Sequence, residues 1–207
     1  MFIPQTLRMA ILAFGVSCLL PALASEPDDV GKVEKTRNEV TARPSAADPS
    51  RPLAAGNAVF RNEMVTTGVQ ARAELRLSDD TSLVLGENAE VKLDEFVYDK
   101  EGSATINLVT GAMRFVSSAS GHPGKLTIRT AVATIGVRGT DFWVGPIDGV
   151  YGVLLLTGNV EVTNAGGSVT LDNPRTGTLI TGADKAPGDA VPWPDDRRIR
   201  ALSKTDF

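Results

Sequence analysis

An eight-residue repeat between residues 73 and 96 limits most tightly what this chain can fold into. Each of its three units, 73–80, 81–88 and 89–96, holds two aliphatic residues separated by one position and then a polar stretch. In a strand, this period-two spacing places both aliphatic side chains on one face, whereas an eight-residue repeat drifts against the 3.6-residue turn of a helix. The repeat predicts short strands whose buried rows are Leu75, Leu77, Leu83, Leu85, Val91 and Leu93, with corners at Asp79–Asp80, Glu87–Asn88 and Asp94–Glu95.

A second similarity links residues 108–115 with residues 155–162, because each segment joins two apolar runs through a Thr-Gly step. The glycines, Gly111 and Gly158, allow the positive φ that a tight hairpin or bulge needs. No long helix is indicated between residues 56 and 182, so we expect an all-β domain of roughly a dozen short strands. These strands could stack as solenoid-like rungs, form a double-sheeted β-roll, or make an ordinary sandwich.

The segment Ile135–Val144 places two glycines and a threonine among β-branched and aromatic residues, which is typical of two strands joined by a tight bend. Gly139 is expected to bend the backbone, the Thr140 hydroxyl to satisfy the turn, and Phe142 to pack in the core. A second interpretation is chemical. If the peptide bond is strained, the Thr140 hydroxyl could attack the Gly139 carbonyl and give an ester that water hydrolyses. The residue pattern favours the structural role.

The first 24 residues have the form of an export signal. Arg8 is followed by a 12-residue apolar run, which is too short to span a bilayer and ends at Pro21. A small-x-small motif at residues 22–24 predicts cleavage between Ala24 and Ser25. The mature protein is therefore expected to be periplasmic or secreted, with no stable membrane insertion. Two alternatives are a buried N-terminal helix and a lipoprotein anchored through Cys18. Against the second, residues 15–17 lack the bulky apolar residue that a lipoprotein site requires three positions before the cysteine.

Cys18 is the only cysteine, so the mature chain would contain none and could form no intramolecular disulfide. Loss of Arg8 with the signal leaves 20 basic residues against 25 acidic residues, a net charge of about −5. No basic stripe is present, so nucleic acid is not an expected partner.

Composition divides the mature chain into three zones. Residues 25–55 are polar and Pro-containing, with a possible first strand near 30–40, and otherwise resemble a linker. Residues 56–182 alternate apolar and polar residues and form the predicted β domain. Residues 183–207 are Pro-rich, with a possible short helix from Asp195 to Leu202 whose two leading acidic residues suit a helix N-terminus.

Residues suited to catalysis are scarce. His122, the only histidine, lies in a Gly- and Pro-containing stretch that predicts an exposed loop. Without cysteine in the mature chain, neither a zinc site of the usual kind nor a Cys-His pair can form, and no nucleophile elbow is present for a serine triad. Carboxylate pairs could in principle make a glycosidase site, but 25 acidic residues make that criterion uninformative. We therefore expect a protein that is not an enzyme and has no cofactor.

Several segments, in order along the chain, resemble the FecR domain of bacterial envelope proteins over about residues 30–182. They are Gly56-x-x-Val59, Val65-x-Thr67-Gly68, Ala73-x-Leu75-x-Leu77, Asp80-Thr81-x-Leu83-x-Leu85, Leu108–Phe115, Thr134–Phe142 and Leu155–Val162. The residues that match the family's signature are Gly136, Arg138, Gly139, Thr140 and Phe142.

Family members known as anti-sigma regulators carry a cytoplasmic region and a membrane helix ahead of this domain. This chain has an export signal in that place, so it resembles the exported, stand-alone branch. The resemblance implies a non-enzymatic module that binds an envelope protein or cell-wall component, and it allows a role in signalling. The alternatives are an envelope enzyme acting on carbohydrate or peptidoglycan, and a self-processing regulator cleaved between Gly139 and Thr140, as some relatives look to be.

Overall fold

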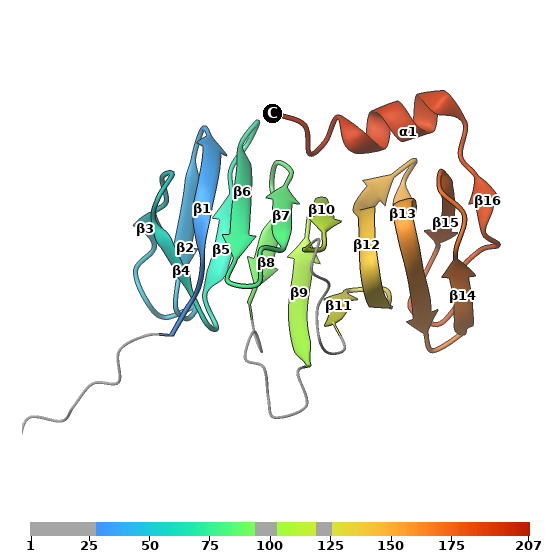
Figure 1. Ribbon diagram of the computed structural model, residues 1–207, viewed down its shortest axis with the longest axis horizontal. Coiled ribbons are helices and arrows are strands. Elements are labelled where there is room, and N and C mark those ends of the chain that lie inside the picture. The colour runs from blue at the N-terminus through green and yellow to red at the C-terminus, as the bar shows by residue number, and fades with distance from the viewer. Residues whose placement is uncertain (1–27, 94–102, 119–125) are drawn as a thin grey trace, which may run out of the picture.

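The computed structural model describes residues 28–93, 103–118 and 126–207. The predicted signal segment with Cys18, Ala24 and Ser25, the corner at Asp94–Glu95, and His122 lie outside these residues. The described part contains sixteen strands and one short helix (Figure 1). They are β1 (Asp29–Arg37), β2 (Val40–Arg43), β3 (Arg51–Pro52), β4 (Ala58–Phe60), β5 (Met64–Thr67), β6 (Arg72–Leu77), β7 (Ser82–Leu85), β8 (Glu90–Lys92), β9 (Ala104–Thr110), β10 (Met113–Val116), β11 (Leu126–Thr130), β12 (Thr134–Ile147), β13 (Val150–Asn164), β14 (Gly167–Leu171), β15 (Thr176–Ile180), β16 (Val191–Pro192) and α1 (Asp195–Leu202).

All sixteen strands belong to one curled sheet that divides into two branches at β12. Residues 141–144 of β12 pair with β10, which leads through β7, β6 and β1 to β4; we call this branch layer A. Residues 134–137 of β12 pair with β11, which leads through β9, β8, β5 and β2 to β3; this is layer B. Strand β13 runs antiparallel to nearly the whole of β12 and carries β14 and β15 on its other edge.

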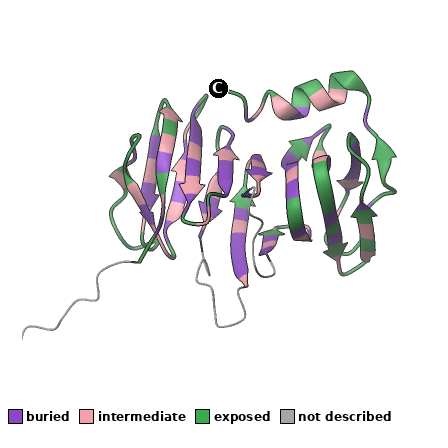
Figure 2. Ribbon diagram, in the orientation of Figure 1, coloured by how far each residue is buried: buried purple, intermediate pink, exposed green. Residues whose placement is uncertain are grey.

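The two layers enclose a single large apolar core (Figure 2). The six aliphatic residues of the eight-residue repeat all lie in it and are at most 2% exposed. Their burial confirms the period-two interpretation. The all-β fold is also confirmed, and the described residues contain no long helix. The strands form one curled sheet and not solenoid-like rungs, because the paired strands are antiparallel everywhere except at β9 and β11.

The first two units of the repeat form a hairpin, and the third crosses to the other layer. β6 and β7 pair directly, and Asp80 has a φ of 68° in the turn between them. Asp79 fixes this turn by accepting hydrogen bonds from the backbone nitrogen and hydroxyl of Thr81, at 3.0 and 2.8 Å. The next corner, with Asn88 at a φ of 51°, leads into β8 of layer B.

The segments on either side of residues 56–182 also contribute strands. The predicted first strand near residues 30–40 is present as β1, and β2 follows it after Asn38, whose φ is 58°. β1 pairs with β6, while β2 pairs with both β3 and β5. Residues 40–43 and 51–52 therefore form strands of the sheet within a segment whose composition suggests a linker, because the backbone groups of any residue but proline can both donate and accept in a sheet.

The predicted helix from Asp195 to Leu202 is present as α1. Ahead of it, Trp193 is 3% exposed and meets Trp143 edge-on, with ring centroids 6.4 Å apart. This pair belongs to a second, smaller apolar cluster with Ile147, Leu154 and Ala201. The segment then runs back along the ends of the strands toward β6 (Figure 1). Within the described residues, no helix combines the length and apolarity that crossing a membrane requires.

Candidate functional site

The signature segment lies at the point in β12 where the two layers diverge. Gly139 has a φ of 61°, and the pairing of β12 with β13 shifts register between Arg138 and Asp141. The expected succession of strand, bend and strand is therefore observed. A Cβ placed on Gly139 would meet no described atom within 4 Å, so the positive φ is what favours glycine there.

Gly158 faces this bend from β13. Its φ is 86°, and a Cβ on it would lie only 2.3 Å from the Gly139 carbonyl oxygen and 2.6 Å from Cγ2 of Thr140. Gly111 occupies a separate tight turn between β9 and β10, where a Cβ would lie 2.5 Å from Cα of Ala89. The structure thus brings Gly139, Thr140 and Gly158 together and leaves Gly111 elsewhere.

Thr140 is 2% exposed, and its hydroxyl oxygen has no hydrogen-bond partner within the described chain. The expectation that this hydroxyl satisfies the turn is wrong. The backbone does so instead, since the Thr140 carbonyl accepts a hydrogen bond from the Ser117 nitrogen at 2.9 Å. Phe142 is fully buried against Phe115, with ring centroids 5.4 Å apart, as expected of a core residue. Arg138 is exposed, and Gly136 is half-buried in layer B.

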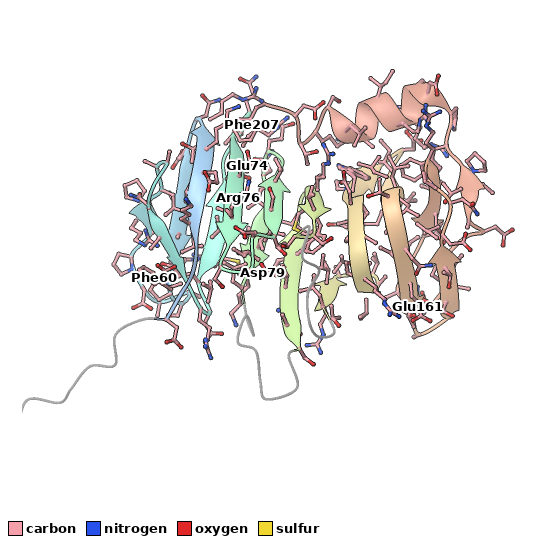
Figure 3. The ribbon with its side chains drawn as sticks, viewed as in Figure 1. Phe60, Glu74, Arg76, Asp79, Glu161 and Phe207 are labelled. Carbon is pink, nitrogen blue, oxygen red and sulfur yellow. The ribbon has the colours of Figure 1, made fainter. Side chains whose placement is uncertain are left out.

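A groove of about 620 Å³ lies on the outer face of layer A. Cross-strand pairing sets its side chains in two rows over β6, β7 and β10. One row is Glu74, Val84 and Arg114, and the other is Arg76, Ser82 and Val116. Val84 and Val116 are half-buried, so they give an apolar floor with a guanidinium in each row. Figure 3 shows Glu74 and Arg76 along β6, below Phe207.

Carboxylates hold both arginines in place. Arg114 donates two hydrogen bonds to Asp141, at 2.9 and 2.7 Å, and the pKa of Arg114 is raised chiefly by these bonds. Arg76 lies 3.4 Å from a Glu34 oxygen and 3.9 Å from a Glu74 oxygen. The Ser82 hydroxyl donates to Glu74 at 3.3 Å. Such paired charges fix the direction of each guanidinium and leave further donors for a ligand.

The last residues of the chain border this groove. Arg72 donates to the Ser203 carbonyl at 3.3 Å, and the ammonium of Lys35 lies 4.1 Å from the centre of the Phe207 ring. The Lys204 carbonyl passes so close to β7 that a Cβ on Gly86 would lie 2.7 Å from it. Thr205, Asp206 and Phe207 form one wall of the groove.

Sequence reasoning did not identify this groove. The alternation within each strand could have shown that residues 74, 76, 82 and 84 face outward together. Nothing in the sequence indicated that β7 pairs with β10 or that residues 203–207 return to the groove.

The arrangement offers directed donors, carboxylates and an apolar floor, which are groups that bind and orient a ligand. Within the described residues, no group of three or more His, Cys, Asp or Glu side chains could hold a metal ion.

The fold defines the class of this protein: a two-layered, all-β domain whose layers diverge from one pair of long strands. Residues 63–161 match the family model described as FecR protein. Residues 63–161 are therefore a FecR domain, as the motifs of the sequence predicted. No curated protein sequence matches it.

Two crystal structures share the fold, each described as a putative anti-sigma factor from Parabacteroides distasonis ATCC 8503. One, at 2.50 Å resolution, has a TM-score of 0.56 and 17% sequence identity, and the match covers 67% of this chain. The match spans only 63% of the length of that relative. The other, at 1.65 Å resolution, has a TM-score of 0.53 and 16% identity, with coverage of 69% of this chain and 74% of that one.

Proposed function

We propose that this chain is a non-catalytic, exported binding module of a signalling system, and that it docks a partner protein through the groove on layer A. Its FecR domain and its structural likeness to proteins described as anti-sigma factors support a regulatory role. The observation that carries the proposal is the groove itself: an apolar floor at Val84 and Val116 on an otherwise polar face, with two fixed guanidinia beside it.

This combination suits a protein partner. Interfaces between proteins are enriched in arginine and aromatic side chains, around an apolar centre and within a polar rim. Phe207 supplies an aromatic ring at the groove wall and is 37% exposed. The volume of about 620 Å³ leaves room for one or two inserted side chains of a partner.

We place the partner in the cell envelope, because the sequence predicts removal of residues 1–24 and release outside the cytoplasm. N-terminal sequencing of the protein purified from an envelope fraction tests this compartment. The expected first residue is Ser25. A retained Met1, or a lipid on Cys18, would contradict it.

Affinity capture with a matched pair of variants tests the groove. Val84→Lys introduces a charge into the apolar floor, whereas Thr66→Lys places the same charge on the outer face of layer B, also at a half-buried strand position. The wild type and Thr66→Lys are expected to capture one envelope protein in equal amounts, and Val84→Lys to lose it. Equal capture by all three proteins would show that the groove is not the docking site.

One observation favours a second candidate function, self-processing at Gly139–Thr140. The Thr140 hydroxyl is buried without a partner beside a glycine of positive φ, and an unpaired hydroxyl is available as a nucleophile. In that reaction the hydroxyl oxygen bonds to the Gly139 carbonyl carbon, the peptide C–N bond breaks, and water hydrolyses the resulting ester. Incubation of the purified protein distinguishes this candidate from the first.

A further inference from the structure

Gly136 lies in the first half of β12, and nothing in the described fold requires a glycine at this position. Its φ is not in the left-handed region, and a Cβ on it would meet only the Glu161 carbonyl oxygen, at 3.9 Å, among the described atoms. A glycine inside a strand weakens the strand, and it often marks a point where a ligand approaches the backbone. Gly136 therefore differs from Gly139 and Gly158, which the bend requires.

Gly136 lies in a depression of about 580 Å³ on the outer face of layer B, away from the groove. Strand pairing places Thr127 on one side of Gly136 and Glu161 on the other. The neighbouring row consists of Arg129, Thr134 and Thr163. The missing side chain at position 136 thus opens a gap in a surface of hydroxyl groups.

The two charged residues of this depression are unpaired. Arg129 on β11 and Glu161 on β13 are both exposed, and neither has an ion-pair or hydrogen-bond partner for its side chain in the described part of the chain. The arginines of the layer A groove, in contrast, are held by carboxylates. Figure 3 shows Glu161 near the lower end of the molecule, far from Glu74 and Arg76.

The far wall of the depression is built rigidly. The Asn164 amide nitrogen donates to the carbonyls of Gly182 and Lys185, at 3.1 and 2.7 Å. The Asn164 side-chain oxygen accepts from the Gly166 nitrogen at 2.9 Å. Asn164 is thereby occupied in fixing the turn after β13, which leaves Arg129, Glu161 and the threonine hydroxyls to meet a ligand.

We propose that this depression is a second binding site, which takes a short peptide with free ends. The peptide carboxylate pairs with the Arg129 guanidinium, and the ammonium group pairs with the Glu161 carboxylate. The peptide backbone crosses the gap at Gly136, where the threonine hydroxyls can donate to its carbonyls and accept from its amides. A separated cation and anion on one open face complement a zwitterion and disfavour a neutral ligand or one with a single charge.

The volume of the depression lies within the range of small-molecule sites. Because both charges are exposed and screened, affinity should be modest, with a Kd of roughly 0.1–1 mM. Specificity for the two charged ends is the property that defines the site.

Nuclear magnetic resonance titration with three forms of trialanine tests the proposal: unmodified, N-acetylated, and C-amidated. The unmodified peptide is expected to shift the amide signals of Thr127, Gly136, Glu161 and Thr163 saturably, and each cap to weaken binding about tenfold or more. No saturable shift, or equal binding of capped and free peptides, would overturn the proposal.

Substitutions in the depression test which residue contacts each part of the peptide. Gly136→Val fills the gap with a residue that strands favour, so it should abolish binding while the melting temperature stays level or rises. Arg129→Gln should make the free and amidated peptides bind equally weakly, and Glu161→Gln should do the same for the free and acetylated peptides. Thr66→Val and Arg43→Gln change the same layer outside the depression and should bind like the wild type. Full binding by Gly136→Val would contradict the site.

Discussion

The bend between the layers depends on two glycines for different physical reasons. Gly139 needs its left-handed φ but has open space around it, whereas Gly158 has both a positive φ and a backbone oxygen in the place of its missing Cβ. Forcing a residue with a side chain into the left-handed region costs about 1–2 kcal/mol. A close backbone contact adds to that cost because the backbone itself must move.

Substitutions at these two glycines should therefore rank in a defined order. Gly139→Asn should be nearly tolerated, since asparagine adopts a positive φ more readily than other residues. Gly139→Val should lower the free energy of unfolding by about 1–2 kcal/mol, and Gly158→Ala should lower it further despite its smaller side chain. Urea unfolding of the three variants gives the order. A milder effect of Gly158→Ala than of Gly139→Val would contradict the geometry.

The Gly139–Thr140 bond should remain intact in the purified protein. Backbone pairing on both sides holds the bend, and the Thr140 carbonyl is hydrogen-bonded to Ser117. Electrophoresis and intact-mass analysis over prolonged incubation should show a single species for the wild type and for Thr140→Ser. Two fragments that meet at this bond, and that disappear in Thr140→Ala, would make self-processing the leading mechanism.

At the scale of single elements, apolar and polar residues alternate along each strand of the repeat. Substitutions on the buried face should therefore cost more stability than substitutions on the outer face. Leu85 is fully buried, so Leu85→Ala should cost about 2–5 kcal/mol. Arg76 lies on the outer face and its ion pairs are partly exposed to water, so Arg76→Ala should change stability by no more than about 0.5 kcal/mol. Chemical denaturation of both variants measures this difference. Similar losses would refute the alternation.

The C-terminal segment should be held mainly by Trp193. A Cβ on Gly152 or Gly177 would lie 2.8 or 2.5 Å from the Trp193 ring, so these two glycines leave room for the indole. Trp193→Ala should cost about 3–5 kcal/mol and should expose Arg197, Arg198 and Arg200 to trypsin. Ile199→Ala is the matched control, because Ile199 is 67% exposed and should change neither property. Slow trypsin cleavage of Trp193→Ala would show that other contacts hold α1.

The sequence predicted the elements that depend on local pattern. The buried rows of the repeat, the bend at Gly139 and α1 each follow from the spacing or chemistry of a few neighbouring residues. The sequence did not predict β2 and β3 or the groove, since these depend on pairing between segments far apart in the chain. The strongest example is the contact of Arg72 with Ser203, which are 131 positions apart.

At the scale of the whole molecule, the two layers share one core but present different outer faces. The outer face of layer A carries the groove with its fixed charges and apolar floor, and residues 203–207 border it. The outer face of layer B carries hydroxyl groups and unpaired charges around Gly136. The proposed protein partner thus belongs to the first face and the proposed peptide to the second.

Site-specific photo-crosslinking in living cells tests the central claim, that this chain docks a partner protein through layer A. A photoreactive residue is placed at Val84 in the groove, and in a separate variant at Thr66 on the opposite face. The account predicts one discrete adduct from position 84 and none of that mass from position 66. No adduct from position 84, or the same adduct from both positions, would contradict it.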